Sequence, residues 1–319
     1  MQRFIDIDKL TGVCITLVVF GHLLLPQFEH LSHYVVIREF IYKFHMPLFM
    51  FLSGFLIALS LKSKGEKFDY LNYIKGKITK FLPPYVLFST IFTLVEFLVK
   101  KKSFNDLSLD LLYTYILPAK SPAGFLWYIY VLFLFYISIP FLLKLLKGQV
   151  IFLVIFGILF QFVNHHITDV LCLKLYSYYF FFVSIGVLVY QNIDKYYFLL
   201  DKLGWFFIFL FIVLVAFDLN YDLITKFQLG LVSIPSFHFL ARRFDNFLPN
   251  FIVTLGKSSF YIYLMNTLFI GGVSLVMIKF NIPFNYVTLF FLFLIGLYLP
   301  IVIKKYVIDK FKIIKILIP

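Results

Sequence analysis

The chain has 319 residues, of which 62% are hydrophobic, 22% aromatic and only 14% charged, and its mean hydropathy is +0.94. Soluble domains are less apolar and carry more charge, so this composition excludes a soluble globular protein and indicates an integral membrane protein. The net charge of +13 does not indicate a nucleic-acid partner, because most of the 29 Lys and Arg residues lie in short gaps between apolar segments. That placement instead fits contact with membrane lipids and their anionic headgroups.

Apolar segments of membrane-spanning length follow one another along the whole chain. A spanning helix needs about 20 such residues, each adding about 1.5 Å to its length. We therefore predict an all-α integral membrane protein, a bundle of about ten transmembrane helices that form a single domain over residues 1–319. The predicted spans are 10–26, 41–61, 81–99, 124–146, 149–164, 170–190, 203–219, 223–241, 258–278 and 286–303.

The basic residues give these spans an orientation. With the N-terminus in the cytoplasm, most Lys and Arg residues fall on the cytoplasmic side, as the positive-inside rule requires. Both termini are then cytoplasmic, and the loops 164–169 and 218–222 face outward together with His30 and His33. The first span lacks the small-residue exit of a cleavable signal peptide, so we expect it to be a retained helix of a multi-pass cell-membrane protein.

Segment 62–81, "KSKGEKFDYLNYIKGKITKF", alternates Lys with aromatic and aliphatic residues. This pattern is typical of an amphipathic helix that lies on the inner membrane surface. A solvated basic loop explains it equally well. A basic surface at this position could also receive a phosphorylated ligand from the cytosol.

The first span is almost entirely apolar, yet it contains His22 four residues before its proline. On a helix that turns about 100° per residue, Asp8, Thr11 and His22 share one face, with about 16 Å between Thr11 and His22 along the axis. An ionisable side chain inside a span is costly and indicates a functional site. The alternative is a neutral histidine that is hydrogen-bonded for structural reasons.

The second span opens with another histidine, His45, two residues before Pro47. Pro47 suits the first turn of a helix, which places His45 just before that turn, at the mouth of the bundle. An imidazole accepts and returns a proton near neutral pH, so His22 and His45 in one pocket indicate acid–base chemistry. Behind them, Ser53 and Gly54 permit close helix packing.

Five stretches of the chain carry a resemblance to a known family. They are "IDIDKLTGVCITLVVFGH", "FHMPLFMFLSGFL", "GFLWYIYVLFLFY", "YYFFFVSIGVLVY" and "LGKSSFYIYLMNTLF". In this order and spacing they resemble the acyltransferase-3 family of membrane acyltransferases, including its fucose-acetylase-like branch. Members of that family O-acetylate cell-surface polysaccharides and related glycans.

The resemblance implies an O-acyltransferase in a bacterial plasma membrane, with acetyl-CoA as donor substrate and no permanently bound cofactor. His22 matches the family's first-helix histidine, which is taken as catalytic, and His45 matches the histidine of the "FHMP" segment. Two positions depart from the family pattern. Thr11 stands where relatives carry Arg or Lys, a cation that would hold CoA phosphates, and Asn266 stands where relatives often carry a histidine. We expect Asn266 to hydrogen-bond a substrate rather than to carry a proton.

Acyl transfer to a sugar hydroxyl needs a base that removes the hydroxyl proton as the oxygen attacks the thioester. We expect His22 to be this base, and His45 to orient it, to polarise the carbonyl or to relay the acyl group. Acyl-CoA would enter from the cytoplasm, where four basic residues are candidates for binding its phosphates, although the positive-inside rule alone also explains them. These are Lys9, Arg242, Arg243 and Lys257.

Further polar and aromatic residues are candidates for binding the glycan acceptor. They are Asp8, Thr11, Arg38, Glu39, Ser53, Glu96, Trp127 and Asn266. Trp127 could stack on a sugar ring, or it could serve only as an interfacial anchor. For Arg38 and Glu39 the alternative is a salt bridge within a loop.

The remaining motifs are weaker. "HHITD" at 165–169 is one residue too short for the His-His…Asp motif of soluble condensing acyltransferases and offers too few ligands for a metal. Cys14 and Cys172 lie in apolar segments and provide no metal site either. Three other functions stay open, namely a transporter or flippase for glycans or lipid-linked sugars, a glycan polymerase, and a family member without activity. Dependence on acetyl-CoA separates the leading hypothesis from all three.

Overall fold

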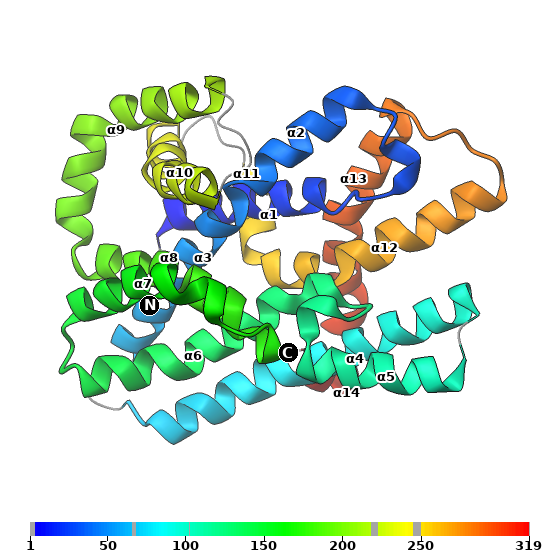
Figure 1. The fold of residues 1–319 in the computed structure, drawn as a ribbon, viewed down its shortest axis with the longest axis horizontal. Helices are drawn as coiled ribbons and strands as arrows, with labels where there is room; N and C mark the ends of the chain where they lie inside the picture. The colour runs from blue at the N-terminus through cyan, green and yellow to red at the C-terminus, as the bar shows by residue number, and fades with distance from the viewer. Residues whose placement is uncertain (1–3, 66–67, 102, 218–222, 245–249, 319) are drawn as a thin grey trace. The chain divides into compact units, whose positions relative to one another are not determined.

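The computed structural model describes residues 4–65, 68–101, 103–217, 223–244 and 250–318. Within these ranges the chain forms helices and no strand, so the all-α prediction is confirmed (Figure 1). The chain divides into two compact units, one of residues 1–52 with 192–307 and the other of residues 53–191 with 308–319. Helix α3 (His45–Lys62) contributes its beginning to the first unit and its remainder to the second.

The first unit is built around α1 (Ile5–Gly21), which packs against α10, α11, α12 and α13. Its side chains Leu10, Cys14 and Ile15 are completely buried. The other elements of this unit are η1 (Pro26–Phe28), α2 (Ser32–Tyr42), α9 (Ile193–Ala216), α10 (Leu223–Arg243), α11 (Asn250–Lys257), α12 (Ser259–Lys279), α13 (Tyr286–Ile303) and most of the π-helical turn η7 (Lys304–Ile308).

Two glycines bring α1 and α11 into backbone contact. A Cβ atom added at Gly12 would collide with the carbonyl group of Ile252, and one added at Gly256 would collide with the carbonyl group of Asp8. Small residues allow this approach in membranes, where helix association depends on packing more than on the hydrophobic effect. The contact fixes the position of the N-terminal half of α1, which contains Asp8 and Gly12.

The second unit pairs α7 with α8, and α6 with both α4 and α8. Gly54 confirms the predicted close packing, because a Cβ there would collide with the backbone of Val183 on α8. The elements of this unit, besides most of α3, are α4 (Tyr70–Lys100), α5 (Phe104–Ile116), η3 (Pro118–Lys120), η4 (Gly124–Leu126), α6 (Trp127–Leu145), α7 (Val150–Val163), η5 (Asn164–His166), η6 (Val170–Cys172), α8 (Leu173–Gln191) and α14 (Lys312–Leu317).

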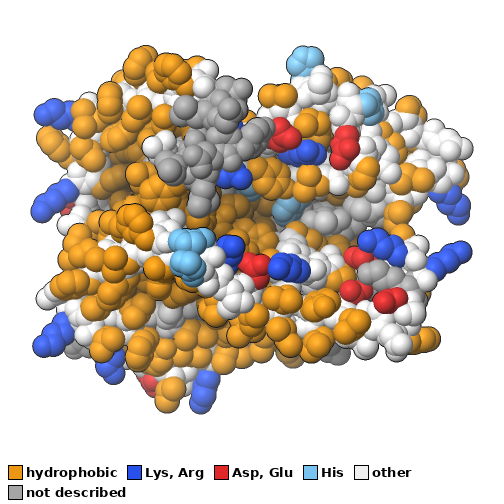
Figure 2. Space-filling view, in the orientation of Figure 1, with side chains coloured by type: hydrophobic (Ala, Val, Ile, Leu, Met, Phe, Trp, Pro, Cys, Tyr) orange, Lys and Arg blue, Asp and Glu red, His pale blue; other side chains and the backbone are white. Residues whose placement is uncertain are grey.

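Long apolar helices confirm that the chain is a membrane protein. Among the described residues, seven helical segments are long and apolar enough to cross a membrane. They are Ser32–Lys62, Tyr70–Lys100, Gly124–Leu145, Val170–Gln191, Ile193–Ala216, Ser259–Lys279 and Tyr286–Ile308. Large apolar side chains such as Phe209 and Val287 are exposed, and hydrophobic side chains cover much of the face in Figure 2. Such a surface suits lipid contact. The count of ten spans and the cytoplasmic termini stay predictions.

Several helix limits differ from the predicted spans. Helix α3 begins at His45 itself, so this histidine is in the first turn rather than just before it. Helix α9 begins at Ile193, ahead of the span predicted from residue 203. Residues 70–81 are helical, but they are the beginning of α4, which Asp69 caps, rather than a separate surface helix. The helices α2, α5, α11 and α14 were not predicted, since none is a continuous apolar segment of spanning length. The predicted outer loop 218–222 lies outside the described residues.

We predict that Gly54→Ala destabilises the protein, because the added methyl group must push α3 away from the α8 backbone. Overpacking of this kind costs about 1–3 kcal/mol. Gly271→Ala is the control, because a Cβ there meets nothing within 4 Å. Fluorescence-detected gel filtration after heating should show a lower melting midpoint for Gly54→Ala alone. Equal midpoints for the two variants would contradict the packing described above.

Candidate functional site

His22 caps the C-terminal end of α1 and lies directly after Gly21. Its Nδ1 atom is 2.8 Å from Oδ1 of Asn266 on α12, and the Asn266 side chain is completely buried. The ring of Tyr263, one helical turn before Asn266, has its centroid 6.0 Å from that of His22. The first helix therefore brings the predicted histidine to a polar partner on a distant part of the chain.

The hydrogen bonds of Asn266 determine which way its amide group points. Its Nδ2 atom donates to the backbone carbonyls of Ile262 and Tyr263, at 2.7 and 2.9 Å. Carbonyl oxygens only accept, so the amide oxygen must face His22, and Nδ1 of His22 must carry the proton that it donates. In a neutral imidazole the lone pair is then on Nε2. His22 is therefore held as a ring that accepts a proton at Nε2.

Thr267 supports this arrangement from the next position on α12. Its hydroxyl donates to the amide oxygen of Asn266 at 3.1 Å and lies 3.4 Å from Nδ1 of His22. The amide oxygen thus accepts from two groups at once. This shared acceptor restricts both the Asn266 amide and the His22 ring.

His45 lies in the same unit and is connected to the end of α1 through Tyr42. The Tyr42 hydroxyl donates to the carbonyl of Gly21 at 3.1 Å, and its ring meets the His45 ring edge to face at 5.0 Å. Nδ1 of His45, which is buried, is 2.7 Å from the carbonyl of Ile41. A carbonyl cannot donate, so a neutral His45 also has its lone pair on Nε2.

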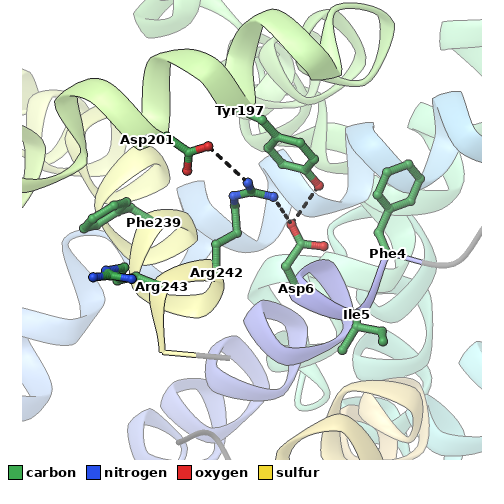
Figure 3. Close-up of a pocket in the computed structure, with 8 residues that line it drawn as sticks. All are labelled: Phe4, Ile5, Asp6, Tyr197, Asp201, Phe239, Arg242 and Arg243. Atoms are coloured by element: carbon green, nitrogen blue, oxygen red, sulfur yellow. Dashed lines mark hydrogen bonds and ion pairs between the residues drawn. The ribbon is translucent and has the colours of Figure 1, made fainter. Parts of the chain in front are cut away.

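At the opposite end of α1, Asp6 is the centre of a polar cluster that the sequence analysis did not identify. Its Oδ2 accepts from the Tyr197 hydroxyl at 2.7 Å and from Nε2 of His238 at 3.0 Å. Arg242 lies between Asp6 and Asp201, with N–O distances of 3.9 and 3.5 Å (Figure 3). Its guanidinium carbon is 3.7 Å from the centroid of the Tyr197 ring. The cluster joins α1 to α9 and α10.

A pocket of about 510 Å³ opens beside this cluster. Arg242 and Arg243, both predicted as phosphate contacts, line it, but Arg242 shares its charge with two carboxylates. Lys9 is buried and Lys257 is exposed, and neither is among the lining residues. The pocket is lined by Phe4, Ile5, Asp6, Tyr197, Asp201, Phe239, Arg242 and Arg243 (Figure 3).

The two polar regions lie at opposite ends of one helix. Asp6 and His22 are sixteen residues apart on α1, which corresponds to about 24 Å along the axis. Between them the predicted polar stripe is packed rather than open, because Thr11, Ile15 and Val18 are buried. The Thr11 hydroxyl donates to the carbonyl of Ile7 within the helix, at 2.7 Å. Asp8 is half-buried in the same turn.

Comparison with known proteins identifies the family. A family model described as an acyltransferase domain matches residues 4–305, almost the whole chain. The chain belongs to the acyltransferase-3 family. No curated protein and no solved structure matches this acyltransferase significantly. The resemblance predicted from the five sequence stretches is confirmed.

The acyltransferase carries its remaining predicted acceptor contacts on other elements. In the first unit, Arg38 and Glu39 are on α2, and the guanidinium carbon of Arg38 lies 5.6 Å from the centroid of the Tyr34 ring. Arg38 is therefore occupied by an aromatic partner. Whether either residue binds a substrate stays a prediction.

In the second unit, the residues that were predicted to bind the glycan acceptor all contact other side chains. The Ser53 hydroxyl is 2.8 Å from that of Tyr128, and Glu96 forms an ion pair with Lys100 at 2.8 Å. Trp127 stacks on Tyr179, with the ring centroids 5.3 Å apart and the planes 17° from parallel. One face of the indole is thus covered, so a sugar ring could stack only on the other face.

The "HHITD" motif of the acyltransferase is a surface feature. Lys120 forms an ion pair with Asp169 at 2.8 Å, and this hydrogen bond lowers the pKa of the Asp169 carboxyl. The rings of His165 and His166 lie against each other, with centroids 3.8 Å apart. Within the described part of the chain, no group of three or more His, Cys, Asp or Glu residues could hold a metal ion.

The sequence pattern indicated Asp8 but neither Asp6 nor His238. A carboxylate and a histidine near the cytoplasmic ends of two predicted spans were the available signal. Asp6 and His238 are 232 residues apart, so the sequence did not indicate that they form a pair. Asn266 was named, but as a substrate contact. The structure assigns its amide oxygen to His22.

We predict that Asn266→Leu lowers the rate of acyl transfer by about 10- to 100-fold, as loss of an orienting partner does at other polar sites. The leucine removes the acceptor that keeps the proton on Nδ1 of His22. Asn164→Leu is the control, because Asn164 is also buried but donates to Lys174 and Ser177 instead of a histidine. Turnover should be measured relative to the folded fraction of each variant. Equal losses in both would contradict a specific role.

We predict that Asp6→Ala lowers the melting midpoint by several degrees, because Tyr197, His238 and Arg242 all lose a largely buried partner. The exposed ion pair of Asp169 with Lys120 provides the comparison, since surface pairs contribute only about 0–1 kcal/mol. Thermal unfolding of Asp6→Ala and Asp169→Ala should therefore differ clearly. A midpoint for Asp6→Ala that matches wild type would show that the cluster does not stabilise α1.

Proposed function

We propose that the protein is an acyl-CoA-dependent O-acyltransferase that transfers an acetyl or similar acyl group to a hydroxyl of a cell-surface polysaccharide or its lipid-linked precursor. Its place would be the plasma membrane of a bacterium, with several spans. Family membership supports acyl transfer in general. The observation that carries the proposal is the hydrogen bond between His22 and Asn266, because it makes Nε2 of a half-buried histidine the proton acceptor.

In the proposed reaction, the imidazole ring of His22 is the base for acyl transfer. Nε2 of His22 takes the proton of the acceptor hydroxyl while the oxygen attacks the thioester carbonyl. The carbon–sulfur bond then breaks, the new ester is released, and the protonated ring returns its proton to the leaving thiolate. The reaction consumes one hydroxyl and one thioester and produces one ester and one thiol, with no net change in protons. Asn266 keeps the proton on Nδ1 throughout, so that Nε2 is the nitrogen that gains and loses a proton.

The hydrogen bond from His45 to Ile41 narrows the role of this second histidine. A neutral His45 can accept at Nε2 but cannot donate there, so it suits a hydroxyl that it holds and orients. Polarising the thioester carbonyl would require the doubly protonated ring. We therefore propose that His45 orients the acceptor.

Acyl-CoA would bind from the cytoplasm, and the pocket beside Asp6 is one candidate site for its phosphates. In the described part of the chain no carboxylate pairs with Arg243, so its charge suits a phosphate better than that of Arg242. The acyl end must then reach toward His22, about 24 Å along α1. Acyl transfer to a hydroxyl beside His22 therefore needs the extended arm of a donor that is bound at this pocket.

Radiolabelled acetyl-CoA tests the proposal. Wild type, His22→Ala and the control His165→Ala are purified into nanodiscs and incubated with the donor and a surface-glycan fraction. His165 lies in the exposed loop after α7 and should not matter. We expect label transfer by wild type and by His165→Ala, and a loss of about 100-fold or more in folded His22→Ala.

Two results would contradict the proposal. Unchanged transfer by His22→Ala would remove His22 as the base. No consumption of acetyl-CoA by folded wild type with every acceptor fraction supplied would favour the transporter or inactive-relative hypotheses instead. Transfer that occurs only with an acyl group other than acetyl would keep the mechanism and change the donor.

A further inference from the structure

Three lysines of the second unit gather over aromatic rings near the end of α3. The Nζ atom of Lys64 is 5.3 Å from the centroid of the Tyr73 ring, and that of Lys77 is 5.0 Å from the same ring. Lys77 is also 3.9 Å from the Tyr136 centroid. The Nζ atom of Lys62 is 5.9 Å from the centroid of the Tyr190 ring. We call Lys62, Lys64 and Lys77 the lysine cluster.

Aromatic faces hold these ammonium groups but do not neutralise them. Each lysine keeps N–H donors that a ring cannot satisfy as well as an anion does. Two cations over one ring also repel each other, unless a negative charge lies close by. Among the described residues, none of the three lysines forms an ion pair with a carboxylate. The cluster therefore has excess positive charge.

A pocket of about 560 Å³ opens beside Lys62, one member of this cluster. Lys62 and Tyr190 both line it, together with Gly65, Leu143, Val187 and Gln191. Among the described residues that line it there is no Asp or Glu. Gly65 has a φ of +50°, a left-handed conformation that allows the chain to turn sharply after α3.

The pocket beside Asp6 differs in charge. There, two carboxylates and two arginines line the same space, and Arg242 is shared between Asp6 and Asp201. An anion entering that pocket would meet both signs of charge. An anion entering the pocket at the lysine cluster would meet the ammonium group of Lys62 and the ring of Tyr190. Of the two pockets, the second is the better site for a phosphate-bearing ligand.

We propose that the lysine cluster binds phosphate groups of a ligand at the inner face of the membrane. The chemical class is a phosphate monoester or diester. It could come from the phosphates of the acyl-CoA donor, which rests on the function proposed above, or from the headgroup of an anionic phospholipid. In either case the three lysines supply the charge, and Tyr190 supplies an apolar wall for the ligand.

The test compares two triple variants of the full chain. Lys62→Gln, Lys64→Gln and Lys77→Gln together remove the cluster. Lys144→Gln, Lys147→Gln and Lys202→Gln together remove the same charge from three exposed lysines that line neither pocket. Arg at all three cluster positions is a third variant, which keeps the charge. Gel filtration confirms that each variant is folded.

In one arm, calorimetry measures CoA binding to each protein in phosphatidylcholine nanodiscs. In the other arm, native mass spectrometry measures phosphatidylglycerol retained from mixed nanodiscs. We expect the cluster-to-Gln variant to lose about tenfold or more in one arm, since several charge-assisted contacts disappear. The control and the cluster-to-Arg variant should change less than about threefold in that arm.

A loss in the CoA arm assigns the site to the donor, and a loss in the lipid arm assigns it to a phospholipid. No specific loss in either arm overturns the proposal. The label-transfer assay on wild type tests the proposed function separately. A protein that binds CoA through the cluster but transfers no acyl group would keep this site and remove that function.

Discussion

The hydrogen bond from Nδ1 of His22 to the amide oxygen of Asn266 is the constraint on which the rest of the site depends. A neutral imidazole can exist in two forms, which differ in the nitrogen that carries the proton, and the hydrogen-bond partner of one nitrogen decides between them. Here the partner is itself fixed, because its amide nitrogen is committed to two backbone carbonyls of α12. The two backbone carbonyls fix the orientation of the Asn266 amide, and the amide oxygen in turn keeps the proton on Nδ1 of His22. The basic lone pair is therefore on Nε2. Because the Asn266 amide is neutral, it orients His22 without placing a charged partner in the apolar interior, where such a charge would be costly.

Helix α1 connects this site to the opposite end of the first unit. Backbone contact with α11 through Gly12 and Gly256 fixes the helix laterally. The bonds of Asp6 to Tyr197 and His238 hold its first turn. A rigid α1 carries His22 to a constant position relative to α12. We therefore regard the Asp6 cluster as a support for the site, and Arg242 as part of that support more than as a ligand contact.

The sequence predicted the class of the structure better than its contacts. Apolar length alone identified an all-α membrane protein, and Gly54 was correctly assigned to helix packing. The ordered motifs identified the family. His22 was selected as a candidate site residue because an ionisable side chain inside an apolar span is energetically costly. The pairs of His22 with Asn266 and of Asp6 with His238 could not be predicted, since 244 and 232 residues separate the partners. Such pairs depend on which helices become neighbours, and a single sequence does not give that order.

The tautomer of His22 is the central claim and can be measured without an activity assay. The protein, labelled with ¹⁵N-histidine, is reconstituted in lipid, and solid-state NMR resolves protonated from unprotonated ring nitrogens. The His22 signals are assigned by their absence from His22→Gln. We expect a protonated Nδ1 and an unprotonated Nε2 at neutral pH, and a change of this pattern in Asn266→Leu. A proton on Nε2 in wild type, or a pattern that Asn266→Leu leaves unchanged, would contradict this claim.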